Sequence, residues 1–129
     1  MLFRRREIPW EVVDSRSVDP VPMYYEDEDL EIAAIKDSTV RRMYAFDVKC
    51  EGKHRGDLHK AVIFARDQLL QEMNKNGYNI LLLESWRVTI LRKGKRHRVE
   101  VEYSGRPARA LNKVLKRQPP FMAVLQHHA

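Results

Sequence analysis

The residues best placed for acid–base or nucleophilic chemistry in this 129-residue chain are one carboxylate, two serine hydroxyls and the single cysteine thiol. Glu84 stands among apolar residues, and burial would raise the pKa of its carboxyl group, as a general acid or base requires. The alternative is that Glu84 faces water at a strand bulge. Cys50 follows apolar strand residues, and Ser85 and Ser104 lack the setting of a nucleophile elbow. The sequence therefore assigns no catalytic residue, and the enzyme question stays open with a lean towards no.

Five histidines raise the question of a metal site. His54 and His59 lie on either side of an expected helix start, so they do not share one helix face. His97 could approach His54 if their loops converge, with Glu51 or Asp57 completing a site. Solvated loop histidines are the simpler interpretation, because metal sites need matched supporting groups around their ligands. No metal and no cofactor are predicted.

The charge of the chain is distributed unevenly. The formal net charge is +6, but residues 1–50 hold 8 Lys/Arg against 11 Asp/Glu and residues 51–129 hold 16 against 7, which gives −3 and +9. Such asymmetry favours an anionic partner for the second half. The apolar runs at 80–83 and 121–125 are far shorter than the roughly 20 residues that cross a bilayer. With one cysteine and no secretory signal, we expect no membrane contact and an intracellular protein in an unknown compartment.

Periodicity sharpens after residue 40 and predicts six elements. Alternation predicts a strand near 40–50, and an apolar stripe with Asn76-Gly77 behind it predicts a helix over 57–76. Strands at 78–92 and 97–103 flank a turn at Lys93-Gly94. The sequence then predicts a second helix over 104–117 and a final strand at 121–126, with a terminal helix as the alternative there. The order strand, helix, strand, strand, helix, strand is that of an α+β, ferredoxin-like split β-α-β sandwich over residues 40–126.

Residues 1–39 differ in character from the rest of the chain. Three prolines and no sustained period indicate an extended N-terminal arm, and residues 26–31 form an acidic segment within it. Trp10 and other large apolar residues argue that the arm docks on its own domain or on a second subunit. We therefore divide the chain into an arm, 1–39, and an α+β domain, 40–129, and expect a possible homo-oligomer, such as a homodimer, through the arm.

A ferredoxin-like topology would bring three basic loops to one end of the domain. The eight residues expected to bind there are Lys53, Arg55, Lys93, Lys95, Arg96, Arg98, Lys116 and Arg117. This pattern predicts a non-enzymatic basic binding module that docks a polyanion, with the nucleic-acid backbone as first candidate, or an acidic protein surface. No aromatic residue is expected on the open sheet face, which disfavours base stacking there. Two alternatives remain: a small enzyme or ligand-binding protein with a pocket near Glu84, and a homo-oligomeric structural or interaction protein.

Overall fold

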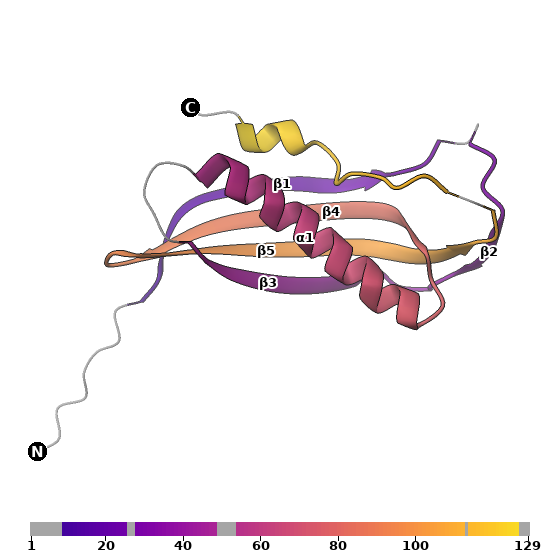
Figure 1. Ribbon diagram of the computed structural model, residues 1–129, viewed down its shortest axis with the longest axis horizontal. Helices are drawn as coiled ribbons and strands as arrows, with labels where there is room; N and C mark the ends of the chain where they lie inside the picture. Colours follow the sequence, from indigo (N-terminus) through magenta and orange to yellow (C-terminus); the bar gives the residue numbers. More distant parts are fainter. Residues whose placement is uncertain (1–8, 26–27, 49–53, 113, 127–129) are drawn as a thin grey trace, which may run out of the picture.

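The fold is a five-stranded antiparallel sheet with one long helix across one face (Figure 1). The structure, a computed structural model, describes residues 9–25, 28–48, 54–112 and 114–126. Its elements are β1 (Glu11–Pro22), β2 (Ile32–Ile35), β3 (Val40–Val48), α1 (His54–Lys75), β4 (Ile80–Lys93), β5 (Arg96–Ala110) and the short 3-10 helix η1 (Met122–Gln126). The predicted α+β class agrees with this arrangement. None of the helices described is long and apolar enough to cross a membrane.

The sheet is organised around the long β4–β5 hairpin. β1 pairs with the outer edge of β4, while β3 and β2 follow one another along the outer edge of β5. All pairings are antiparallel, so β3 and β4 run parallel on either side of β5, with α1 as their connection. The predicted strand, helix and hairpin of residues 40–103 are therefore present. The helix begins at His54, three residues before the predicted start, and ends at Lys75.

The second half of the predicted ferredoxin-like topology is not confirmed. Residues 104–110, predicted as the start of a helix, continue β5, and residues 122–126 form η1 where a strand was preferred. Pairing on both sides of β5 explains the difference. Its last residues pair with β4 on one side and β2 on the other, and Asn79 adds two side-chain hydrogen bonds to the Ala110 backbone, at 2.8 and 2.7 Å. These partners satisfy the backbone better than an isolated helical turn, whatever the local spacing of apolar residues.

The N-terminal arm docks on its own chain. β1 lies antiparallel to β4 in the same sheet, and Val18 is buried opposite Trp86. β2, which follows the acidic segment, adds a second short strand beside the end of β5. Of the two interpretations left open for the arm, docking on its own domain therefore describes residues 11–22.

The core lies between α1 and the sheet. The predicted helical stripe is buried along its whole length: Leu58, Val62, Ala65, Leu69 and Met73. The alternate residues of β3 and β5 that were predicted to face the helix do so. Val99, Val101 and Tyr103 are buried, and Tyr44 and Phe46 pack against this core. Trp86 completes the core, and its indole N–H donates to the Pro120 carbonyl at 2.8 Å. This bond ties the C-terminal segment to the sheet.

Candidate anion-binding sites

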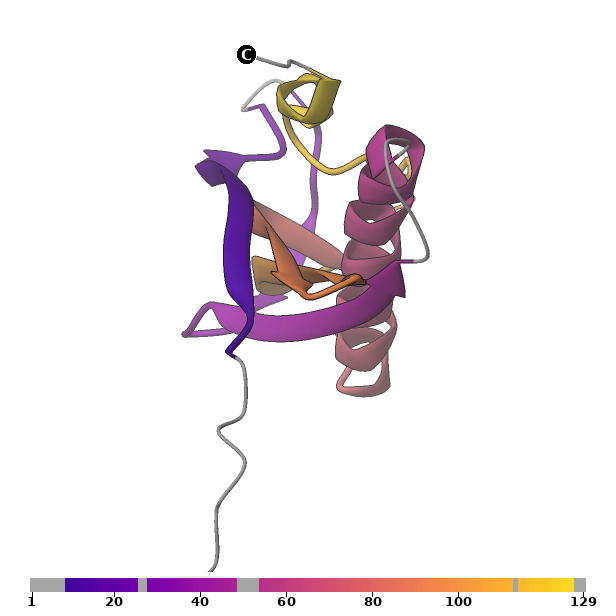
Figure 2. The same ribbon diagram turned by 90° about the vertical axis from the view of Figure 1, so that its left-hand side faces the viewer.

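The first candidate site is the tip of the β4–β5 hairpin. Gly94 adopts a φ of 62° in the turn, a conformation that favours glycine. The turn places Lys93 directly opposite Arg96 and leaves Lys95 exposed. Four of the eight predicted residues, Lys93, Lys95, Arg96 and Arg98, therefore lie together at one end of the sheet, which faces the viewer in Figure 2.

Trp10 organises this cationic tip. The Lys93 ammonium lies 5.9 Å from the centroid of the indole ring, and the guanidinium carbons of Arg96 and Arg98 lie 5.4 and 4.5 Å from it. Each such contact is worth about 0.5–1 kcal/mol at an exposed site. Sequence reasoning missed this role, because Trp10 lies more than eighty residues from its partners and no local spacing connects them. The hairpin tip thus combines its cations with an aromatic ring that the sequence analysis did not place there.

Among the residues that the structure describes, the cations of the hairpin tip outnumber the acids that pair with them. Arg92 pairs with Glu11 at 3.3 Å and Arg98 with Asp47 at 3.7 Å. Among the described residues, no carboxylate lies within ion-pair distance of Lys93, Lys95 or Arg96. Within the described part of the chain, these three side chains carry positive charge that no carboxylate offsets by an ion pair, and such a surface attracts polyanions.

The predicted convergence of a third basic stretch on the hairpin is wrong. Because β5 runs on to Ala110, the chain leaves the sheet at the end far from the hairpin before it turns back (Figure 1). There Arg117 forms an ion pair with Glu28, in the acidic segment, and Lys116 lies 3.9 Å from Asp67. Lys53 and the side chain of Arg55 lie outside the described residues.

The second candidate site is built around a buried ion pair. Arg66, on α1, donates from Nε to Glu84 Oε1 at 2.6 Å and from Nη2 to Glu84 Oε2 at 3.0 Å. The Tyr103 hydroxyl donates to the same Oε1 at 2.5 Å. Arg66 is 3% exposed and Glu84 1%. Both carboxylate oxygens are thus occupied, and the proposed acid or base at Glu84 is a structural counter-ion in this arrangement.

Burial and hydrogen bonding shift the pKa values of Tyr103 and Arg66 in this network. Burial and the Glu84 carboxylate raise the pKa of Tyr103 far above its ordinary value, so the phenol stays neutral and acts as a donor. Burial is the largest single influence on the pKa of Arg66 and lowers it, but the hydrogen bonds to Glu84 and the attraction of its negative charge together outweigh burial, and the net direction is upward. A charged Arg66 therefore faces its remaining neighbours at every physiological pH.

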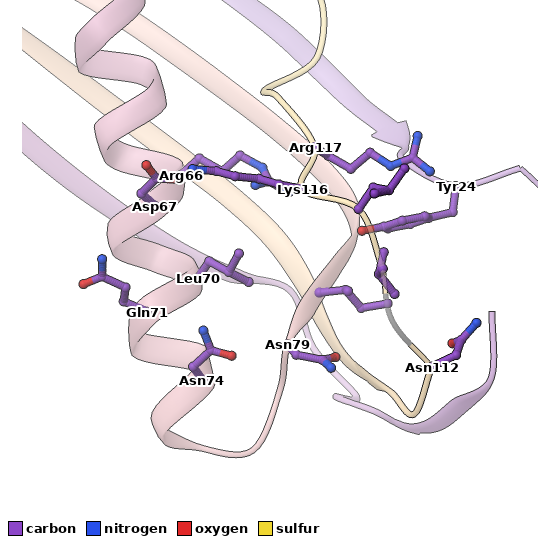
Figure 3. A pocket seen from close by; sticks show the side chains of 13 residues that line it. Tyr24, Arg66, Asp67, Leu70, Gln71, Asn74, Asn79, Asn112, Lys116 and Arg117 are labelled. Carbon is purple, nitrogen blue, oxygen red and sulfur yellow. Dashed lines mark ion pairs between the residues drawn. The ribbon is translucent and has the colours of Figure 1, made fainter. Parts of the chain in front are cut away.

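A pocket of about 460 Å³ lies beside this network, between α1 and the segment that follows β5 (Figure 3). Arg66, Lys116 and Arg117 line it, with Asp67 as the one acid and Leu70 among the apolar residues. Arg66 Nη1 is buried, and none of the described residues accepts a hydrogen bond from it. A buried donor without an acceptor costs about 1–3 kcal/mol, so an anion that reached Nη1 would recover that free energy.

The ring of Tyr24 forms one wall of this pocket. The Arg117 guanidinium lies 4.8 Å from its centroid, and burial raises the pKa of its hydroxyl. Tyr24 therefore enters the pocket as a neutral donor that complements the cations.

The described residues contain no group of three or more histidines, cysteines or acids that could hold a metal ion. The predicted approach of His54 to His97 lies outside the described side chains, since His54 is described only in its backbone. Comparisons of the chain with protein-family models, with curated proteins and with solved structures found no match.

Proposed function

We propose that this chain is a non-enzymatic binding module that docks the sugar–phosphate backbone of nucleic acid on its hairpin tip. The observation that carries the proposal is the grouping of Lys93 and Arg96 at the Trp10 ring, with Lys95 exposed in the turn between them. Among the residues that the structure describes, no carboxylate forms an ion pair with any of the three. The interpretation needs only the hairpin, so it does not depend on the third basic stretch that lies elsewhere.

Phosphates suit this surface better than isolated carboxylates do. A row of phosphates spaced by a few ångströms can engage several of the cations at once and release the counterions condensed on the nucleic acid. Trp10 holds the guanidinium groups of Arg96 and Arg98 near its ring, which reduces the side-chain entropy lost on binding. Contacts of this kind fix position and carry no base sequence, so we expect binding with little sequence preference.

Removing two cations from the tip should weaken nucleic-acid binding more than removing two elsewhere. We expect Lys95→Ala/Arg96→Ala to lower the affinity for a labelled oligonucleotide for every sequence alike, and to reduce the salt slope by about 1 per lost contact. Lys60→Ala/Lys75→Ala is the matched control, because both lysines are exposed on α1 and the net charge changes equally. Fluorescence anisotropy at several salt concentrations measures both quantities.

Three other outcomes of this titration would each contradict the proposal. Equal losses in the two double variants would mean that net charge alone attracts the probe. No binding of single-stranded or duplex probes at low salt would reject nucleic acid. Stronger competition by polyglutamate than by an oligonucleotide of equal charge would indicate that the partner of the hairpin tip is an acidic protein surface.

The pocket beside Arg66 supports a second candidate function, the binding of a small oxyanion such as a phosphate or carboxylate. Its volume of about 460 Å³ lies within the range of ligand pockets, about 300–1,000 Å³. Arg66 Nη1 has almost no solvent access, so a ligand oxygen reaches it only after a small shift of the overlying 114–117 segment. The ion pair that links this segment to α1, between Lys116 and Asp67, is long, at 3.9 Å, and the Lys116 side chain is largely exposed.

Inorganic phosphate and acetate serve as probes of this pocket. At one hundred times the dissociation constant, we expect a bound anion to stabilise the fold by about 2.7 kcal/mol, measured as a rise in the thermal unfolding midpoint. Chloride at equal ionic strength should give no such rise. Lys116→Ala should weaken the effect and Lys60→Ala should not, because only Lys116 lines the pocket. Identical curves with chloride and phosphate would remove this function, and the two probes distinguish a phosphate from a carboxylate ligand.

A further inference from the structure

The two edges of the sheet are protected to very different degrees. β1 forms one edge, and its pairing with β4 is interrupted between Val12 and Asp14 and again between Val18 and Val21, near two prolines. β3 forms most of the other edge, and its nine residues stay in register with β5 without a shift and without a proline. Figure 1 shows these two strands as the outermost of the sheet. Bulges and prolines discourage pairing with another chain, whereas a long regular edge invites it.

Apolar side chains gather beside this regular edge. Phe64, on α1, is 45% exposed and packs edge-to-face on Phe46 and Tyr44, with ring centroids 5.4 and 6.3 Å away. On the other face of β3, Met43 is 56% exposed. Large apolar side chains beside the outer edge of an edge strand are typical of a surface that another strand covers.

The charges of β3 identify the strand that fits there. Arg41 and Asp47 stand near opposite ends of the strand on one face, and their side chains are 68% and 76% exposed. When a strand pairs antiparallel with a copy of itself, residues equally far before and after the central residue face one another. A pairing centred on Tyr44 sets Arg41 opposite Asp47 of the partner subunit, and by symmetry this happens twice.

We propose that the protein forms a homodimer in which β3 of each copy pairs antiparallel about a two-fold axis at Tyr44. The two sheets then form one continuous sheet, and the outer backbone groups of both β3 strands gain hydrogen bonds. An isologous contact needs a self-complementary surface, and β3 supplies it with a cation at one end and an acid at the other. The homo-oligomer expected through the N-terminal arm is thereby assigned to β3, because β1 of that arm is already paired with β4.

Charge reversal and charge exchange test this register directly. We expect sedimentation equilibrium to give twice the chain mass of 15.3 kDa at micromolar concentrations. Arg41→Asp and Asp47→Arg each place two like-charged pairs opposite one another, so each should weaken the dimer by about tenfold or more. The double variant Arg41→Asp/Asp47→Arg restores opposite charges and should recover dimerisation. Asp19→Arg, at an exposed position on the β1 edge, is the control and should leave the mass unchanged.

Each remaining outcome counts against the proposal. A monomer at all accessible concentrations excludes the dimer, and a dimer that Asp47→Arg leaves intact lies on another surface. A double variant as weak as the single ones places Arg41 and Asp47 apart and rejects the register. Circular dichroism of every variant excludes unfolding as the cause, because both residues also form ion pairs within the chain, with Glu102 and Arg98.

Discussion

Replacing Glu84 with alanine is expected to lower the free energy of unfolding by about 3–5 kcal/mol, because it leaves a buried arginine without its counter-ion. Arg66 is 3% exposed and both of its bonds to Glu84 are short, at 2.6 and 3.0 Å. The substitution removes the acceptor of both bonds while the charged guanidinium stays almost wholly out of water. The Tyr103 hydroxyl would lose its acceptor in the same step. Urea denaturation monitored by circular dichroism measures the change.

Two further variants separate the ion pair from simple loss of packing. The double variant Arg66→Met/Glu84→Leu removes both charges and keeps most of the volume, so it should recover most of the lost stability. Tyr103→Phe removes one hydrogen bond to a charged group and should cost about 1.5–3 kcal/mol. A loss for Glu84→Ala below about 1.5 kcal/mol would be smaller than that of a single hydrogen bond to a charged group. Arg66 and Glu84 would then not form a buried pair, and Glu84 would instead be an exposed residue at a bulge.

A chain that begins at residue 40 is expected to show no cooperative unfolding transition. It would lack β1, which covers the outer edge of β4, and β2, which covers the end of β5. Val18 would leave the core, and Arg16 would no longer donate to the Val124 carbonyl, at 3.3 Å. The loss of a twelve-residue strand and its buried side chains compares with the whole stability of a domain, about 5–15 kcal/mol.

The matched control is a chain that begins at Pro9, which keeps all of β1. It should unfold cooperatively at nearly the temperature of the full chain, as calorimetry or circular dichroism would show. A cooperative transition in the shorter chain would instead establish residues 40–129 as a self-sufficient domain and would support the division at residue 39. The experiment therefore shows whether residues 40–129 fold without the N-terminal strands or need them for a stable sheet.

Local patterns were sufficient where one face of an element is buried and its neighbours are close in sequence. The stripe of α1 has a clean helical period, and each of its apolar residues is buried. The β4–β5 hairpin has a two-residue turn, so its register follows from alternation alone. The strand bulge considered at Glu84 is matched by a register shift between Leu81 and Glu84, although the Glu84 side chain is buried. The basic tip follows from the hairpin, which is why four of the predicted site residues lie together.

Patterns failed where distant partners decide the conformation. The helix over 104–117 was predicted from Pro107 at its first turn and from the helical spacing of the apolar residues 110, 111, 114 and 115. Instead, strands on both sides complete the hydrogen bonds of residues 104–110 as part of β5. At Gly105 a side chain would meet the Leu81 methyl groups at 3.0 Å, so this glycine also marks a close approach of two strands. Trp10 and Arg66 belong to the same class, because their partners lie far along the chain and no spacing reveals them.

The lengths of the connections in this sheet also set an order of assembly. The β4–β5 hairpin closes over two residues, whereas β1 reaches β4 only across the whole of β2, β3 and α1, with Val18 opposite Trp86. Closing a long loop costs more chain entropy than closing a short one, and contacts distant in sequence slow folding. In refolding of the whole chain we therefore expect the hairpin to form before the N-terminal strand docks, so that the outer edge of β4 is covered last.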